Sequence, residues 1–337
     1  MRMSLVLPKY SDTIHATFVD NITGQYDVDF CMFKAQLYFK DTWYSCERIY
    51  NKKDGLMFIK DKARLYGLNI EAQDPRIFTV GDKVYVVFIC LSPYPNQERC
   101  LAITLFDEWN PVYLQVEGIP YQPIEKNWAP FEKNNQLYFI YNYDPFVVLQ
   151  YDFNPEGMCK VVFTQTVLPF DTSVTFLRGG SNLIHYKDEY YIGGCHSRLL
   201  QQFTDSMYNY FEHYTHFVVV NTLTWELVYV SEPIQYTCPL KESLGAWAFN
   251  TKRFFKPLDT DHGILVDKSP NLIQDPISLY QKDDRYFLTV NIRDAVTLLY
   301  ELTISPLNLA SRPIGVYDAL VKKMITRPMK ITDSATA

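Results

Sequence analysis

Short apolar strands separated by polar turns recur along the chain, and a tyrosine marks the same place in each unit. The tyrosine is the third residue of an apolar run that follows a polar turn, as in the run that starts at Lys83. The markers are Tyr38, Tyr85, Tyr138, Tyr191 and Tyr286, and the first four are separated by 47, 53 and 53 residues. A repeated strand-turn-strand pattern predicts an all-β fold. A period of about 40–50 residues with four strands is typical of a propeller blade, so we predict a five-bladed β-propeller.

The predicted propeller spans residues 1–305. Its blades are expected at about 10–65, 70–120, 123–170, 176–232 and 270–304. The first blade is expected to open with a hairpin of Phe30–Phe33 and Gln36–Phe39.

Two segments interrupt the repeat. Residues 199–214 are interpreted as an insertion that can be helical, and residues 233–266 as a longer excursion, for which a degenerate sixth blade is the alternative. Residues 306–337 are predicted to form a C-terminal tail with a helix at 316–325.

Composition narrows the class of protein. Aromatic residues make up 16% of the 337 residues, as pleated sheets favour. The net charge is −6 without long charge runs, which disfavours nucleic-acid binding. No apolar run approaches the roughly 18 residues of a membrane span, and the N-terminal run is too short for a secretory signal.

The seven cysteines are odd in number and lack CxxC spacing. We expect reduced, mostly buried thiols in a cytoplasmic protein. The chain lacks the paired spacing of cysteine and histidine ligands that would predict a zinc site. We therefore expect neither a metal nor another cofactor. A divalent metal that bridges a diphosphate is left open.

Polar residues gather in front of the repeated strands. Eleven residues before the tyrosines stand Asp27, Asp74, Asn127, Gly180 and Asp275. The first strand of each propeller blade borders the central channel, so residues near these positions are expected to meet there. The candidate site residues are Asp74, Arg76, Lys126, Asn127, Trp128, Arg178, Gly179, Gly180, Asn182, His196 and Asp275.

These residue types suit an anionic ligand rich in hydroxyl groups. Arg and Lys hold phosphate oxygens, and Asp and Asn bind sugar hydroxyls. Trp128 can offer a flat face to a sugar ring, and Gly179 and Gly180 can let the backbone approach a ligand closely. The structural alternative is that Asp-Pro is a common turn element and that Asp74 and Arg76 pair with each other.

Three tripeptides and a histidine carry a resemblance to a known family. They are Asp74-Pro75-Arg76, Lys126-Asn127-Trp128, Arg178-Gly179-Gly180 and His196. In this order they resemble the signatures of five-bladed propeller enzymes that act on β-mannosides, namely the glycoside hydrolase family 130 phosphorylases and the related mannosyltransferase/phosphorylases. The chain looks closer still to propeller glycosyltransferase-like proteins with the same signatures.

The resemblance implies inverting chemistry on a sugar. Asp74 would be the general acid/base, and Arg76, Lys126, Arg178 and His196 would hold phosphate. Gln73 stands where the phosphorylases usually have Glu, which puts phosphorolysis in doubt more than sugar binding.

We therefore predict an inverting glycosyltransferase that uses a nucleotide sugar or sugar phosphate and a glycan acceptor. One alternative is a glycoside phosphorylase or hydrolase of the same fold. A hydrolase needs a second carboxylate, for which Asp144, Asp275 and Asp294 are candidates. The other alternative is a non-catalytic propeller that binds glycans or a protein. His185 and His213 are interpreted as surface or packing residues.

Overall fold

The computed structural model describes residues 11–23, 30–51, 55–60, 65–68, 72–108, 110–120, 122–169, 177–202, 209–236, 274–292, 296–307 and 309. The regular elements within these ranges are strands, and none is a helix. Accordingly, the described part of the chain holds no helix with the length and apolar character needed to cross a bilayer. The predicted all-β fold is confirmed.

The described strands form five sheets. One contains β2 (Phe30–Phe39), β3 (Thr42–Asn51), β4 (Gly55–Lys60) and β5 (Leu65–Leu68). The next contains β6 (Ala72–Val80), β7 (Lys83–Leu91), β8 (Arg99–Leu105) and β9 (Val112–Tyr113). The third contains β10 (Gln115–Val116), β11 (Ala129–Lys133), β12 (Gln136–Tyr143), β13 (Phe146–Tyr151) and β14 (Met158–Gln165). The fourth contains β15 (Leu177–Lys187), β16 (Tyr190–Gln202), β17 (Asn209–Asn221) and β18 (Glu226–Val230). The last contains β19 (Gln274–Lys282), β20 (Arg285–Ile292), β21 (Val296–Ile304) and β1 (Ile14–Asn21).

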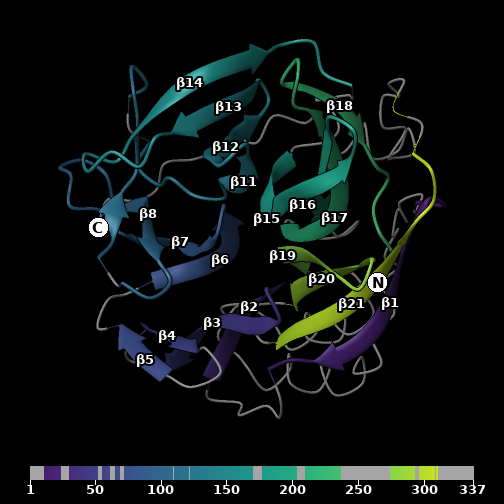
Figure 1. The fold of residues 1–337 in the computed structure, drawn as a ribbon, viewed down its shortest axis with the longest axis horizontal. Helices are drawn as coiled ribbons and strands as arrows, with labels where there is room; N and C mark the ends of the chain where they lie inside the picture. Colours follow the sequence, from purple (N-terminus) through teal and green to yellow (C-terminus); the bar gives the residue numbers. More distant parts are fainter. Residues whose placement is uncertain are drawn as a thin grey trace.

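The sheets are arranged around a common centre, as Figure 1 shows. Each sheet contributes one innermost strand, and these strands contact one another in a closed cycle. The contacts run from β2 to β6, β11, β15, β19 and back to β2. The molecule therefore has the propeller arrangement that the repeat predicts, and its innermost strands surround the centre.

Strand β1 belongs to the last sheet and not to the first. It pairs antiparallel with β21, from Ile14 opposite Ile304 to Asn21 opposite Leu298. The prediction that the first blade begins near residue 10 is wrong in this respect. The physical reason is the edge of β21, whose backbone groups would otherwise lack strand partners.

The first predicted hairpin is also shifted. Residues 30–39 form one continuous strand, β2, which pairs with β3 through the turn at residues 40 and 41. Tyr38 consequently lies in an inner strand, whereas Tyr85 lies in the second strand of its sheet. Tyr44, the third residue of β3, is therefore the residue equivalent to Tyr85. The residue eleven positions before Tyr44 is Phe33, which replaces Asp27 in the set of aligned positions.

Strands such as β7 are continuous apolar runs because both of their faces are covered. In β7, Val86 and Phe88 join a cluster with residues of β2 and β19, while Val87 on the opposite face joins a cluster with β12 and β13. Alternate side chains of one strand thus pack against two neighbouring sheets. The cysteines at positions 46, 90, 100, 159 and 195 are free and buried, as expected.

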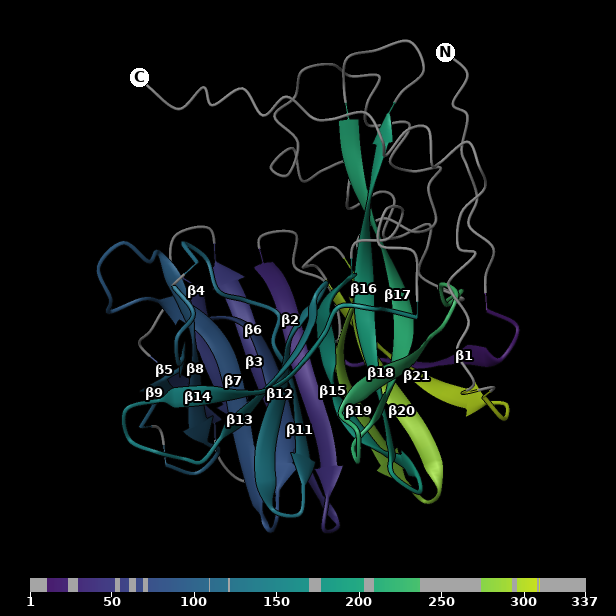
Figure 2. The same ribbon diagram turned by 90° about the horizontal axis from the view of Figure 1, so that it is seen from above.

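The predicted insertion at residues 199–214 is part of a long hairpin. Strands β16 and β17 pair from Tyr190 opposite Asn221 to Gln202 opposite Asn209, so the helical interpretation is wrong for the described part. Figure 2 shows this hairpin projecting beyond the other strands. The excursion at 233–266 beyond residue 236, the proposed sixth blade and the helix at 316–325 lie outside the described residues.

Candidate functional site

Asp74 sits at an irregularity near the start of β6. The pairing with β7 shifts register between Gln73 and Arg76, and Asp74 adopts a φ of 47°, in the left-handed region that non-glycine residues rarely occupy. Its carboxylate lies 3.5 Å from Arg48 Nη1, and 28% of the side chain is exposed. The irregularity therefore presents a partly accessible carboxylate beside Arg48.

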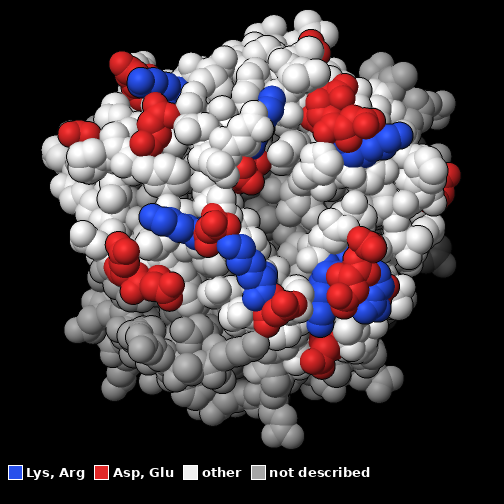
Figure 3. All heavy atoms as spheres, viewed as in Figure 1, with Lys and Arg blue, Asp and Glu red and all other residues white. Residues whose placement is uncertain are grey.

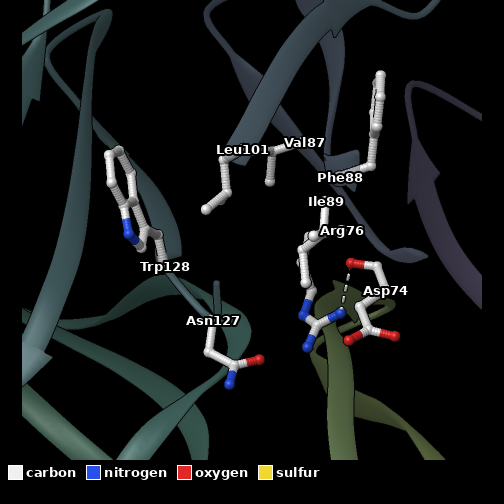
Figure 4. A pocket seen from close by; sticks show the side chains of 8 residues that line it. All are labelled: Asp74, Arg76, Val87, Phe88, Ile89, Leu101, Asn127 and Trp128. Carbon is white, nitrogen blue, oxygen red and sulfur yellow. Dashed lines mark hydrogen bonds between the residues drawn. The ribbon is translucent and has the colours of Figure 1, made fainter. Parts of the chain in front are cut away.

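Arg76 links two sheets. Its Nε donates a hydrogen bond to the Gly180 carbonyl at 2.6 Å, and its Nη1 donates to the Asp74 carbonyl at 2.8 Å, shown dashed in Figure 4. The guanidinium also lies 5.5 Å from the centre of the Phe33 ring. Burial lowers the pKa of Arg76, while Asp74 and Asp275 oppose that shift. Arg76 was predicted to bind phosphate, but much of its hydrogen-bonding capacity is used by backbone carbonyl groups of β6 and β15.

Trp128 is a core residue. Only 2% of it is exposed, and its ring packs against Phe139 and Tyr141 with centroid distances of 5.6 and 5.2 Å. Its Nε1 donates a hydrogen bond to Glu125 Oε2 at 3.3 Å. The expectation of an open platform for a sugar ring is therefore wrong, because apolar neighbours cover the indole.

The two glycines lie where the backbone is closely approached by other parts of the chain. A Cβ on Gly179 would lie 1.6 Å from the Asn127 carbonyl oxygen. A Cβ on Gly180 would lie 2.6 Å from both the Gly194 carbonyl oxygen and the Pro276 ring. The sequence indicated a close approach correctly, but the approaching groups are protein atoms of the loop before β11, of β16 and of β19.

Asn182 ties β15 to β19. Its Nδ2 donates to the Leu279 carbonyl at 2.8 Å, and its Oδ1 accepts from the Leu279 N–H at 2.9 Å. The side chain is buried. The predicted ligand-binding role is wrong, because the amide is engaged with the backbone of the adjacent sheet.

A cavity of about 420 Å³ lies between the loop before β11 and the start of β15. It brings together four of the predicted residues, which are Lys126, Asn127, Arg178 and Gly179. Lys126 is exposed, and Arg178 is half-buried. Burial lowers the pKa of Arg178, while the Asp275 carboxylate acts in the opposite direction. Two cations therefore line a space of ligand size.

Two further residues of this cavity were not predicted as site residues. Glu125 accepts hydrogen bonds from Tyr141 Oη at 3.0 Å and Gln122 N at 3.3 Å, besides that from Trp128. Burial raises the pKa of Glu125, and these hydrogen bonds partly offset the shift. The buried hydroxyl of Tyr143 has no hydrogen-bond partner among the described residues. Glu125 was visible in the sequence beside Lys126, but nothing local indicated that Tyr143 would face the same space.

Asn127 connects this cavity to Asp74. It lines the cavity and also a pocket of about 10 Å³, enough for about one water, with Asp74, Arg76 and Trp128. Figure 4 shows Asn127 and Arg76 extending toward the same space. Figure 3 shows that the face seen in Figure 1 is hollowed near its centre, with acidic and basic side chains interspersed around it.

His196 and Asp275 meet as predicted, and His213 joins them. Asp275 Oδ1 lies 3.0 Å from His213 Nδ1 and 3.6 Å from His196 Nδ1. Burial lowers the pKa of His196 to about 3; His213, Arg178 and Arg76 add to this effect and Asp275 opposes it. Burial acts to raise the pKa of Asp275, but nearby positive charge lowers it overall.

The position of His213 beside His196 and Asp275 was not predicted, because residues 199–214 were interpreted as an insertion. In the hairpin, His196 lies opposite Thr215 and Arg198 opposite His213. His213 is thus a diagonal neighbour of His196 on the same face of the sheet. An interpretation of this segment as two long strands would have indicated the pair.

Comparison with solved structures identifies the fold. A glycosyl hydrolase from Bacteroides ovatus superposes with a TM-score of 0.51 at 11% identity, over 91% of this chain and 94% of the other. MPT-1, a GDP-Man-dependent mannosyltransferase from Leishmania mexicana, gives 0.50 at 8% identity, over 85% and 93%. A third structure comes from the GH130 family of mannoside phosphorylases, and this family contains glycoside hydrolases that target β-1,2 mannosidic linkages in Candida mannan. It gives a TM-score of 0.50 at 9% identity, over 91% of this chain and 93% of the other.

The chain shares the propeller fold of these proteins. No protein-family model and no curated protein matches the sequence. At 8–11% identity the similarity extends to the fold alone.

Proposed function

We propose that this protein is a glycosyltransferase that takes its sugar from a nucleotide sugar or sugar phosphate. The observation that supports this most directly is the 420 Å³ cavity lined by Lys126, Asn127 and Arg178. We also infer that each of the five sheets is one blade, so that the cavity belongs to a five-bladed ring. The fold likeness to carbohydrate-active enzymes agrees with this function.

The roles follow from charge and access. In this proposal, Asp74 accepts the proton of the acceptor hydroxyl as its oxygen bonds to the anomeric carbon of the sugar. The bond from that carbon to the phosphate oxygen breaks, and the electron pair leaves with the phosphate. Lys126 and Arg178 stabilise the negative charge on the leaving group, while the sugar passes through an oxocarbenium-like state.

A second candidate is phosphorolysis of a β-linked oligosaccharide. The same two cations suit inorganic phosphate, and the GH130 relative has the same fold similarity as the mannosyltransferase. Here phosphate attacks the anomeric carbon, and Asp74 gives its proton to the departing glycosidic oxygen. Hydrolysis requires a carboxylate that activates water, and Glu125 is a further candidate because it lines the cavity.

The first experiment is a thermal-shift screen with GDP-mannose, other nucleotide sugars, mannose 1-phosphate and inorganic phosphate. Ligands that raise the melting temperature then enter turnover assays with β-mannoside acceptors. Release of nucleoside diphosphate supports transfer, and release of sugar phosphate from an oligosaccharide supports phosphorolysis. Binding without turnover would identify a non-catalytic propeller and contradict both candidates.

Asp74→Asn tests the general acid/base. We expect turnover to fall by about 10²–10⁴-fold at an unchanged melting temperature, because the amide cannot exchange the proton. The matched control is Asp82→Asn, since Asp82 is an exposed carboxylate paired with Lys40. Equal turnover in both variants would remove Asp74 from the mechanism.

A further inference from the structure

Three potential ligand atoms converge where three strands meet near the centre of the ring. His196 comes from β16, His213 from β17 and Asp275 from β19. One nitrogen of each imidazole and a carboxylate oxygen all lie within 4.8 Å of one another. The strands are also tied together here, because Thr215 Oγ1 in β17 donates a hydrogen bond to the Gln274 carbonyl at 3.2 Å.

The orientation of the imidazoles is the second observation. Their rings stack with a centroid distance of 5.0 Å and an interplanar angle of 16°, and both Nδ1 atoms face the same carboxylate oxygen. His213 Nδ1 is hydrogen-bonded to it, whereas His196 Nδ1 is buried and has no hydrogen-bond partner among the described residues. His196 is 4% exposed. A buried polar atom aimed at a carboxylate but left unpaired calls for a partner that the described residues do not supply.

The distances suit a metal ion. Zinc binds histidine nitrogen and carboxylate oxygen at about 2.0–2.2 Å, so two ligand atoms on a tetrahedral ion are about 3.3 Å apart. The measured separations of 3.0 and 3.6 Å lie on either side of this value. Two imidazoles with one carboxylate are a donor set used by zinc and by other divalent transition metals, and this set leaves coordination positions open.

We propose that His196, His213 and Asp275 bind a divalent transition metal ion of the zinc class. The site rests on their geometry and not on the proposed sugar transfer. Arg76 and Arg178 act on the same carboxylate, so their positive charge opposes a cation. An anion in an open coordination position, such as phosphate, would offset this repulsion and strengthen metal binding.

The experiment measures metal binding without any sugar. Protein dialysed against chelator is titrated with Co²⁺, followed by visible absorption, and with Zn²⁺, followed by calorimetry, each with and without inorganic phosphate. We expect about one equivalent per chain and tighter binding with phosphate. His213→Gln and Asp275→Asn should each weaken binding by at least about 100-fold, more than the loss of an outer partner costs.

The control is His185→Gln, because His185 is an exposed histidine on β15 outside the cluster. It should bind Co²⁺ as the wild type does. Melting curves of the variants show whether each one folds. The wild-type Co²⁺ complex should also show paramagnetically shifted resonances from two imidazoles, a test that needs no variant. Absence of binding, binding unchanged in folded His213→Gln or Asp275→Asn, or a Co²⁺ spectrum without imidazole ligands would overturn the proposal.

Discussion

Two polar regions lie at the centre of the ring, and they differ in how their polar groups are used. At the junction of β6, β15 and β19, Arg76 and Asn182 bind backbone groups of neighbouring strands. In the cavity before β11, Lys126 and Arg178 border about 420 Å³ of space, and the Tyr143 hydroxyl has no partner in the described structure. The first region joins the sheets, and the second is the ligand site of the proposed function.

This difference shows that burial of a polar residue at a propeller centre does not by itself indicate a binding role. Buried polar groups require hydrogen bonds, and adjacent strands can supply them as well as a ligand can. Substitutions in the junction should therefore change stability, whereas substitutions in the cavity should change binding.

The largest effect is expected for Gly179→Ala. The new Cβ would lie 1.6 Å from the Asn127 carbonyl oxygen, so the backbone must move and unfolding free energy should fall by at least about 3 kcal/mol. Gly118→Ala is the control, since its Cβ meets nothing within 4 Å and only its φ of 73° opposes the change. Urea denaturation compares the two, and equal losses would mean that the close approach at Gly179 does not matter.

Asn182→Ala should come next. It removes both hydrogen bonds to Leu279 and leaves a buried N–H and carbonyl unpaired, which costs about 2–4 kcal/mol of unfolding free energy. Asn142 lines the cavity and donates one exposed hydrogen bond to the Asp144 carbonyl. Asn142→Ala should stay within about 0.5 kcal/mol in the same denaturation assay. The comparison fails if Asn142→Ala is the more destabilising change.

Arg178→Ala should weaken binding of inorganic phosphate or GDP by about 10- to 100-fold, since a hydrogen bond to a charged group contributes about 1.5–3 kcal/mol. Calorimetric titration gives the dissociation constant, with the melting temperature measured in parallel. Lys187→Ala removes an exposed cation of β15 outside the cavity and should leave the affinity unchanged. Unaltered affinity in Arg178→Ala would assign this arginine to the junction.

The smallest effect concerns Glu125 and pH. Burial raises its pKa in the folded protein, so the unfolded chain releases this proton at lower pH. Raising the pH from the ordinary pKa of a glutamate to the raised value therefore favours unfolding. Glu125→Gln should lack this decline, and the difference between the two stability-against-pH curves should stay below about 1 kcal/mol because hydrogen bonds to Glu125 offset part of the shift. Parallel curves across this interval would contradict the raised pKa.

Much of the fold could be predicted because the repeat is local. Apolar runs such as the one around Val86 are buried on both faces, and the tyrosine spacing placed Asp74, Asn127, Gly180 and Asp275 near one centre. The first unit was misplaced because Phe30–Phe39 contains enough polar residues to imitate a hairpin, although it is one strand. The closing strand β1 was missed because its partner β21 is nearly the whole chain away.

The amino-acid sequence by itself determined most of the strands, their repetition and the polar character of the ring centre. Only the tertiary structure decided where each polar residue lies and which groups surround it. Arg76 and Arg178 are the same residue type in similar positions, but one binds the Gly180 carbonyl and the other lines a cavity. His213 and Asp275 are 62 residues apart in the chain. They lie side by side because of the β16–β17 hairpin and the contact between β17 and β19. A side chain's hydrogen-bond partners come from strands of different sheets, and sequence patterns within one unit carry no information about them.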